Sequence, residues 1–325
     1  FAAWRTTCET ERTVGRSGEL ELQRECLAER RRELAGFVDA LLAASEDSDK
    51  RLERALAAAE ALPPVASCTD IARLRESGTQ PEQRERVTEL AAALGEARTL
   101  GALGNPSAGL SRAREVEAEA RTLGHPRTHI RALLLIVGLQ RDAKDIDAAL
   151  VVAREAYVEA ERAGEDWLRV EAALDLFGML AFDLDRPAEA EVWSEVADAL
   201  IERLGDPDDL RGRWWMHRGG LHSRAAEHAQ AEGALTQAKQ VLERSFGPDA
   251  VELDPVLSRL GNTMRDQGDY ASALAHHRHV LERRRLAYGP DHPDVATAWA
   301  TLAVDTYYQG HYEESLGYSD ESLRS

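Results

Sequence analysis

The chain has 325 residues, of which 43% are hydrophobic, 30% charged and 6% aromatic, and its net charge is −18 at pH 7. This acidic balance excludes a nucleic-acid ligand, because a phosphate backbone needs clustered Lys and Arg. A basic partner or a self-repelling surface fits the charge better. The longest apolar run, over residues 132–139, is too short to cross a bilayer, so we expect no direct membrane insertion by this chain.

Residues 1–78 are predicted to be helical but not repetitive. Leucines recur every seven residues between positions 20 and 41, which predicts one long amphipathic helix over residues 18–44. A second helix, capped at Asp47 or Ser48, ends before a proline pair. The two helices are expected to form an N-terminal hairpin.

All three cysteines, Cys8, Cys26 and Cys68, fall in this first segment, and none forms a CxxC pair. The close ligand spacing of a zinc site is missing, so no metal is expected. Two interpretations remain open. The cysteines are buried free thiols, or Cys8 and Cys26 form a disulfide, which requires an oxidising compartment.

From residue 79 onward the chain is predicted to be an array of helix pairs. Each pair has a small residue where its helices cross, a turn with Gly, Asp or Pro, and a returning helix. Corresponding Ala-Leu-type positions fall at residues 109, 149, 190, 234, 273 and 315. We therefore predict two regions, residues 1–78 and residues 79–325, with the array ending inside a repeat, as expected for a piece of a longer protein.

The last two pairs repeat one motif in register. Phe246-Gly-Pro-Asp recurs as Tyr288-Gly-Pro-Asp, and Gly268-Asp-Tyr recurs as Gly310-His-Tyr, so both offsets are 42 residues (288−246 and 310−268). Gly261 is predicted to lie at a helix crossing, where a longer side chain would hold the backbones apart. A fixed period of this length indicates stacked helix pairs.

These Leu-Gly, Gly-x-Tyr and Ala-Leu positions resemble the tetratricopeptide repeat, and the linker Tyr288 to Ala296 is similar to that of kinesin light chain repeats. The resemblance implies an all-α, right-handed α-solenoid of about six helix pairs, preceded here by the N-terminal hairpin. It also implies that a protein or peptide ligand binds on the concave face.

A second resemblance covers the N-terminal segment. Trp4, Cys8, Cys26 and Cys68-Thr-Asp70 look like the segment that joins the membrane span of bacterial serine/threonine protein kinases to their C-terminal tetratricopeptide repeats. The resemblance implies a non-catalytic sensor or scaffold region and favours an extracytoplasmic over a cytoplasmic location. The kinase signatures themselves are missing from these 325 residues, so catalysis would reside in another part of a longer chain.

Candidate binding residues lie opposite the packing stripe of the first helix in each pair. Asn262 stands out because its amide can both donate to and accept from a peptide backbone. The alternative for each residue is a solvated surface position. The candidates are Asp175, Met179, Phe182, Ser258, Asn262, Arg265 and Tyr307.

Trp214 and Trp215 form a further candidate pair. Neighbouring residues on a helix point about 100° apart, so both rings can hardly enter one core. We expect one to pack and the other to lie at a contact surface.

No catalytic or cofactor motif is present in the sequence, so we expect neither an enzyme nor a cofactor. No HExxH, P-loop, GxGxxG or nucleophile elbow occurs. His276, His277 and His279 are interpreted as a solvated helix face. The sequence favours a protein- or peptide-binding scaffold, with a self-associating platform as one alternative and an enzyme with an unrecognised site as another.

Overall fold

The computed structural model describes residues 18–43, 68, 83–248, 250–290 and 292–324. Regular structure over these residues is helical, and no β-strand occurs in the described ranges. The chain divides into two compact units, Phe1–Ala172 and Ala173–Ser325, and each is described by itself. The predicted all-α class is confirmed.

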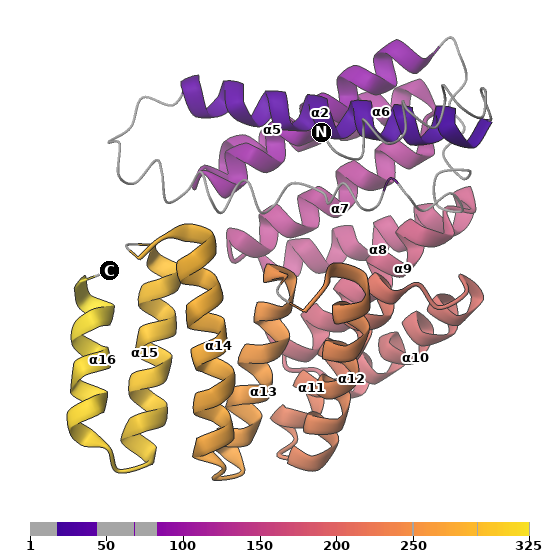
Figure 1. The fold of residues 1–325 in the computed structure, drawn as a ribbon. Coiled ribbons are helices and arrows are strands. Elements are labelled where there is room, and N and C mark those ends of the chain that lie inside the picture. Colours follow the sequence, from indigo (N-terminus) through magenta and orange to yellow (C-terminus); the bar gives the residue numbers. More distant parts are fainter. Residues whose placement is uncertain (1–17, 44–67, 69–82, 249, 291, 325) are drawn as a thin grey trace. The chain divides into compact units, whose positions relative to one another are not determined.

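The first unit contains a long leading helix and two helix pairs (Figure 1). The predicted helix over residues 18–44 is confirmed as α2, whereas its expected hairpin partner lies outside the described residues. α9 (Asp166–Gly178) begins in this unit and ends in the second. The other helices of the unit are α2 (Gly18–Ala43), α5 (Arg84–Ala102), α6 (Pro106–Leu123), α7 (Pro126–Asp142) and α8 (Ile146–Ala163).

A disulfide joins Cys26 of α2 to Cys68, with the two Cα atoms 5.6 Å apart. The predicted bridge between Cys8 and Cys26 is therefore wrong, because a sulfur atom forms one disulfide and that of Cys26 is already bonded. Cys8 lies outside the described residues. Nearness in sequence favoured the shorter loop, but folding brings Cys26 to a cysteine 42 residues away.

The second unit continues with the remaining helix pairs, and α11 to α16 lie side by side in Figure 1. With the two pairs of the first unit and the α9 and α10 pair, this gives the six predicted pairs. A π-helical turn, η3 (Met179–Asp183), extends α9, and a 3-10 turn, η4 (Val251–Leu253), precedes α13. The helices are α10 (Pro187–Arg203), α11 (Asp208–Arg224), α12 (His228–Phe246), α13 (Asp254–Asp266), α14 (Tyr270–Tyr288), α15 (Pro293–Tyr308) and α16 (Tyr312–Arg324).

Local sequence explains where these helices begin and end. Pro187 and Pro293 lie in the first turn of their helices, where a backbone N–H has no acceptor within the helix, so the missing N–H of proline costs no hydrogen bond. Side chains cap the N-termini of other helices. At α14 the Asp269 carboxylate accepts a hydrogen bond from the Ser272 N–H at 3.1 Å. The turns place Gly268 and Gly310 at positive φ, which glycine adopts without steric cost.

Small residues at the crossings set the spacing within a pair. A Cβ at Gly261 of α13 would collide with the ring of His277 on α14, and Ala273 of α14 is fully buried. The predicted crossing at Gly261 is therefore confirmed. Large apolar side chains then fill the space between pairs, as Leu235, Leu257 and their neighbours do between α12 and α13.

Within the described residues, no helix combines the length and apolarity that crossing a membrane requires.

Candidate functional site

The first helices of successive pairs in the second unit touch one another through polar side chains. Arg213 Nη2 donates to Asp175 Oδ1 at 3.3 Å, which joins α11 to α9. Arg265 Nη1 donates to Asp305 Oδ1 at 3.3 Å, which joins α13 to α15. The partners are 38 and 40 residues apart, close to one repeat length. We call the surface formed by α9 with η3, α11, α13 and α15 the first-helix face.

Asn262 is the most exposed polar candidate on α13, and a hydrogen-bonded chain holds it in place. Its Oδ1 accepts from Arg265 Nη2 at 2.8 Å, and Arg265 in turn is bound to Asp305. Asp305 is completely buried. Because Arg265 occupies the amide oxygen, the amide nitrogen of Asn262 is left to donate outward.

His277 supports the same network from the second helix. Its Nδ1 lies 2.5 Å from Asp305 Oδ2, and its Nε2 lies 3.2 Å from the carbonyl oxygen of Ser258. The ring is 2% exposed. The interpretation of this histidine as part of a solvated helix face is therefore wrong, because Gly261 leaves room for the imidazole inside the pair.

Arg259 occupies a different position on the same face. Its guanidinium carbon lies 5.2 Å from the centre of the Phe182 ring, and its Nη1 lies beside Gly220 of α11. Burial lowers the pKa of the Arg259 guanidinium below its ordinary value. Among the described residues, Arg259 has no ion pair and no side-chain hydrogen bond.

Three further sequence candidates are half-buried on this face. Asp175 is half-buried and bound to Arg213, and Phe182 is half-buried against Arg259 and His217. The Ser258 side chain is also half-buried. Together with Asn262 and Arg265, these residues line the first-helix face.

Met179 does not belong to it. The side chain is fully buried, so the predicted exposure is wrong. Met179 opens the π-helical turn η3, whose wider turn changes the angular positions that a regular α-helix would give.

Both tryptophans are packing residues. Trp214 is 8% exposed and its indole N–H donates to the Ser194 carbonyl at 2.9 Å. Trp215 packs against the cluster between α12 and α13. Trp214 is thus the ring that packs, as expected for one of the two, and Trp215 is half-buried with its ring centroid 4.6 Å from that of Trp214. A contact surface at Trp215 stays a prediction.

Tyr307 is 58% exposed at the end of α15 and belongs to an aromatic group. Its ring meets Tyr308 at 6.0 Å and Tyr312 at 5.4 Å, and Tyr308 stacks on Tyr270 at 5.8 Å. No hydroxyl of these four tyrosines makes a hydrogen bond within the described part of the chain. The group presents ring faces and hydroxyl donors to solvent.

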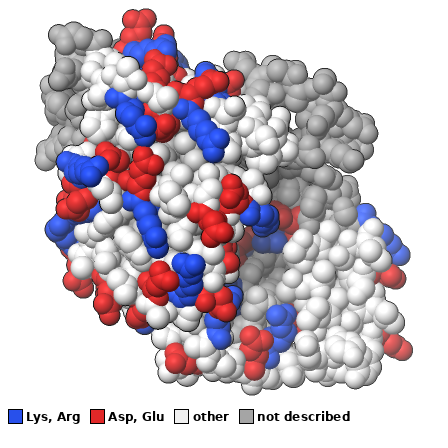
Figure 2. All heavy atoms as spheres, turned by 180° about the vertical axis from the view of Figure 1, so that it is seen from behind, with Lys and Arg blue, Asp and Glu red and all other residues white. Residues whose placement is uncertain are grey.

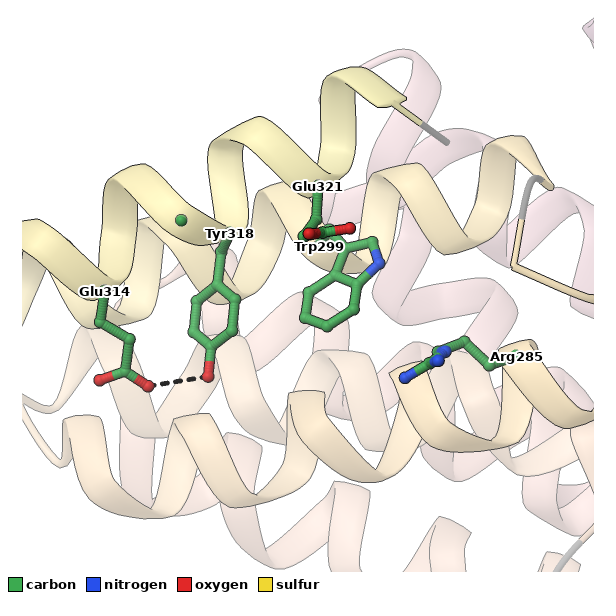
Figure 3. Close-up of a pocket in the computed structure, with 6 residues that line it drawn as sticks. Arg285, Trp299, Glu314, Tyr318 and Glu321 are labelled. Atoms are coloured by element: carbon green, nitrogen blue, oxygen red, sulfur yellow. Dashed lines mark hydrogen bonds between the residues drawn. The ribbon is translucent and has the colours of Figure 1, made fainter.

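A shallow depression of about 500 Å³ lies elsewhere, between α14, α15 and α16. Figure 3 shows the Trp299 and Tyr318 rings side by side, with centroids 5.4 Å apart, and the Tyr318 hydroxyl bonded to Glu314 at 2.8 Å. Arg285 and Glu321 lie at its edge.

The distribution of charge and the search for metal ligands narrow the kinds of ligand that this chain could bind. Acidic and basic side chains intermingle over much of the face in Figure 2, without a continuous basic stripe. In the described ranges, no group of three or more His, Cys, Asp or Glu residues could hold a metal ion.

Sequence reasoning missed Arg259 and Gly220. The available signal was the pair Gly219-Gly220 inside a helix, where glycine is unfavourable. Gly219 is needed at the helix crossing, because a Cβ there would meet Leu235 at 2.5 Å. The crossing does not account for the second glycine.

Comparisons with known proteins agree with this geometry. The family model described as "Tetratricopeptide repeat" matches residues 210–281 and 252–325. Residues 210–325 are thus tetratricopeptide repeats, and the fold is an α-solenoid of helix pairs of this type.

Individual relatives cover parts of the chain. A "Clustered mitochondria protein homolog" of Aspergillus oryzae is 29% identical over 105 residues, or 32% of this chain, which spans 8% of that protein. BtubC from P. vanneervenii has a similar fold, with a TM-score of 0.57 and 18% identity over 66% of this chain and 88% of its own. A signal transduction ATPase of Pyrococcus horikoshii with a tetratricopeptide repeat sensor gives a TM-score of 0.54 at 14% identity, over 90% of this chain and 39% of its own.

Proposed function

We propose that the first-helix face of the second unit is the docking surface for an extended peptide or protein segment. The observation that carries this proposal is the fixed, outward amide of Asn262. Arg265 holds its oxygen and the buried Asp305 holds Arg265, so little conformational freedom is lost when the amide meets a ligand.

The chemistry of the face suits a polypeptide. An amide donor can bind a backbone carbonyl, and the ring of Phe182 offers apolar area nearby on the same face. The fold supports the proposal as well, since the similar Pyrococcus horikoshii protein is described as having a tetratricopeptide repeat sensor.

The test starts from peptides selected by display on the whole chain. Asn262→Ala should lower the affinity of the chain for the selected peptides about 10-fold, which corresponds to the loss of one well-placed hydrogen bond in a desolvated contact. Gln237→Ala is the matched control, because Gln237 is exposed on α12, a second helix. Equal affinities for the two variants would contradict the proposal.

We also propose that the chain is the non-catalytic scaffold region of a membrane-anchored bacterial serine/threonine kinase, on the extracytoplasmic side. The resemblance of the N-terminal segment supports this assignment, and so does the Cys26–Cys68 disulfide, since such bonds persist in oxidising compartments. Mass spectrometry of the non-reduced protein from its own cells should find the two cysteines linked. Free thiols at both positions would contradict this location.

A further inference from the structure

Exposed tyrosines gather at one edge of the last two helix pairs, where the chain turns from one helix to the next. The turns α13–α14 and α15–α16 lie at the same end of these helices (Figure 1). Tyr307, Tyr308 and Tyr312, around the second turn, are each more than half exposed, and Tyr308 stacks on Tyr270 beside the first turn. Contiguous exposed patches mark interaction sites more often than single exposed rings do. We call these four residues the tyrosine edge.

Carboxylates border the tyrosine edge without basic side chains among them. Residues 266–277 and 306–323 contain no Lys or Arg. Asp266, Asp269 and Glu313 are exposed and take part in no ion pair within the described ranges. Hydrogen bonds from Ser272 hold the pKa of Asp269 below its ordinary value, so this carboxylate is ionised at neutral pH. The edge therefore combines ring faces with uncompensated negative charge.

An earlier turn of the same unit shows which cation such a carboxylate binds. Arg224 ends α11 and reaches back to Asp185 in the preceding turn, with Nη2 2.7 Å from Oδ1. Tyr308 ends α15, and its ring reaches back to Tyr270, which directly follows Asp269 of the preceding turn. Each stands two positions before the positive-φ residue of its own turn (226−224 and 310−308). The arginine that the earlier turn receives from its own chain is thus replaced here by an exposed ring.

We propose that the tyrosine edge binds an arginine from a basic segment of a partner protein. The guanidinium lies against the Tyr308 ring, and the Asp269 carboxylate accepts its hydrogen bonds. Arginine suits both groups, because its planar guanidinium stacks on aromatic rings and its parallel N–H groups match a carboxylate. The net charge of −18 attracts any basic chain, whereas the ring and the carboxylate together select arginine over lysine. The site does not use Asn262 and stands apart from the docking surface proposed above.

The test uses the full chain and three capped, fluorescently labelled Gly/Ser peptides that carry arginine, lysine or citrulline at the same positions. Citrulline keeps the shape of arginine without its charge. Fluorescence anisotropy at physiological ionic strength gives the affinities. The arginine peptide should bind about 5-fold more tightly than the lysine peptide, which corresponds to one exposed stacking contact, and the citrulline peptide should bind most weakly. Equal affinities for the arginine and lysine peptides would overturn the inference.

Tyr308→Arg is the sharpest variant, because it supplies from the chain itself the guanidinium that Arg224 supplies to the earlier turn. It should lower the affinity for the arginine peptide about 10-fold, the combined effect of losing one ring contact and one exposed ion pair. Gln237→Arg is the matched control, because it adds the same charge at an exposed position of α12. Equal losses in both variants would assign the binding to net charge and contradict the proposed site.

Two further variants separate the ring from the carboxylate. Tyr308→Leu should remove the preference for arginine over lysine. Asp269→Asn keeps the N-cap of α14, because asparagine caps a helix as well as aspartate does, and it should weaken both basic peptides about 3-fold. Asp320→Asn removes an equal charge from α16 and should weaken neither. A preference for arginine that survives Tyr308→Leu would exclude the ring from the site.

The same peptides distinguish this site from the first-helix face and from self-association. Asn262→Ala should leave the affinity for the arginine peptide unchanged; if that affinity falls, the peptide lies on the first-helix face and the inference fails while the proposed function stands. If the arginine series behaves as expected but Asn262→Ala does not weaken display-selected peptides, the proposed function fails alone. Light scattering after size exclusion tests a second copy as the occupant. A dimer that Tyr308→Arg dissociates would overturn the assignment to a separate partner.

Discussion

Asp305 is the residue that fixes the polar part of the first-helix face. It is completely buried and accepts hydrogen bonds from Arg265 and His277 on two other helices. Removing one member of a buried charged network leaves the others without a partner. The orientation of Asn262 depends on the same carboxylate through Arg265.

Asp305→Asn should therefore lower the free energy of unfolding by about 3 kcal/mol, measured by urea denaturation. Asp320→Asn is the control, because Asp320 is exposed on α16. A stability change of the same size in both variants would mean that the buried network has no special role.

Residue chemistry also predicts a pH effect. Burial first, and then the positive charges of His277, Lys239 and His279, lower the pKa of His276 from its ordinary value of 6.5. The unfolded chain then binds the proton more readily than the folded chain. The stability that the neutral His276 ring contributes is therefore fully present well above pH 6.5. It is lost progressively as the pH falls below that value.

His276→Gln should reduce this dependence, by less than the limit of about 1.4 kcal/mol per pH unit for one proton, because solvent screens the half-buried ring. Urea denaturation at two pH values, on either side of the ordinary histidine pKa, measures the difference. His311→Gln, at an exposed histidine, should leave the pH dependence as it is. An identical pH profile for His276→Gln and the wild-type chain would refute the explanation.

At the scale of an element, the spacing of a helix pair depends on one glycine. Gly261→Ala would place a Cβ against the buried ring of His277, which has little room to move between Asp305 and Ser258. We expect a loss of roughly 1–3 kcal/mol, the usual cost of overpacking.

Gly317→Ala provides the matched control for that substitution. Gly317 lies in α16 with no atom of another residue within 4 Å of its Cβ position, so alanine should be neutral or stabilising there. Chemical denaturation of the two variants separates helix propensity from packing. Equal stability of both would show that the α13–α14 crossing tolerates a methyl group.

Elements were more predictable than sites, for physical reasons. Turn chemistry and helical periodicity act locally, so the six pairs, their turns and the crossing at Gly261 could be predicted from sequence. The burial of Met179 depends on a π-helical turn, and the partner of Cys26 depends on a contact between distant segments. Neither has a local signal.

The candidate site was predicted in part for the same reason. Asn262 and Arg265 were placed by their positions in the repeat, and their hydrogen bond to each other follows from their three-residue spacing. The surroundings of Arg259 are formed by Phe182 of η3 and Gly220 of α11, which lie far from it in the sequence. A linear pattern does not show that such a contact forms.

At the scale of the whole molecule, the repeats are not equally protected. Leu274 and Leu281 of α14 are 8% and 4% exposed, whereas Leu316 and Leu323, each 42 residues later, are 68% and 87% exposed on α16. No residue of α16 is buried. Each pair of a solenoid gains stability from its neighbours, so α16 should open most easily.

Hydrogen exchange followed by mass spectrometry should therefore show the amides of α16 exchanging well before those of α14. The two helices lie in the same unit and differ chiefly in how much of their apolar side is covered. Equal protection of both helices would mean that α16 is covered in solution by something other than its own unit.

The central claim is that the ligand docks on the first-helix face, and site-specific photo-cross-linking tests it most directly. The photoreactive residue replaces either Val304, 43% exposed on α15 and 42 residues after Asn262, or Gln237, exposed on α12. A display-selected peptide should cross-link from position 304 and not from position 237. Cross-linking from position 237 alone would place the ligand on the second helices and contradict the account.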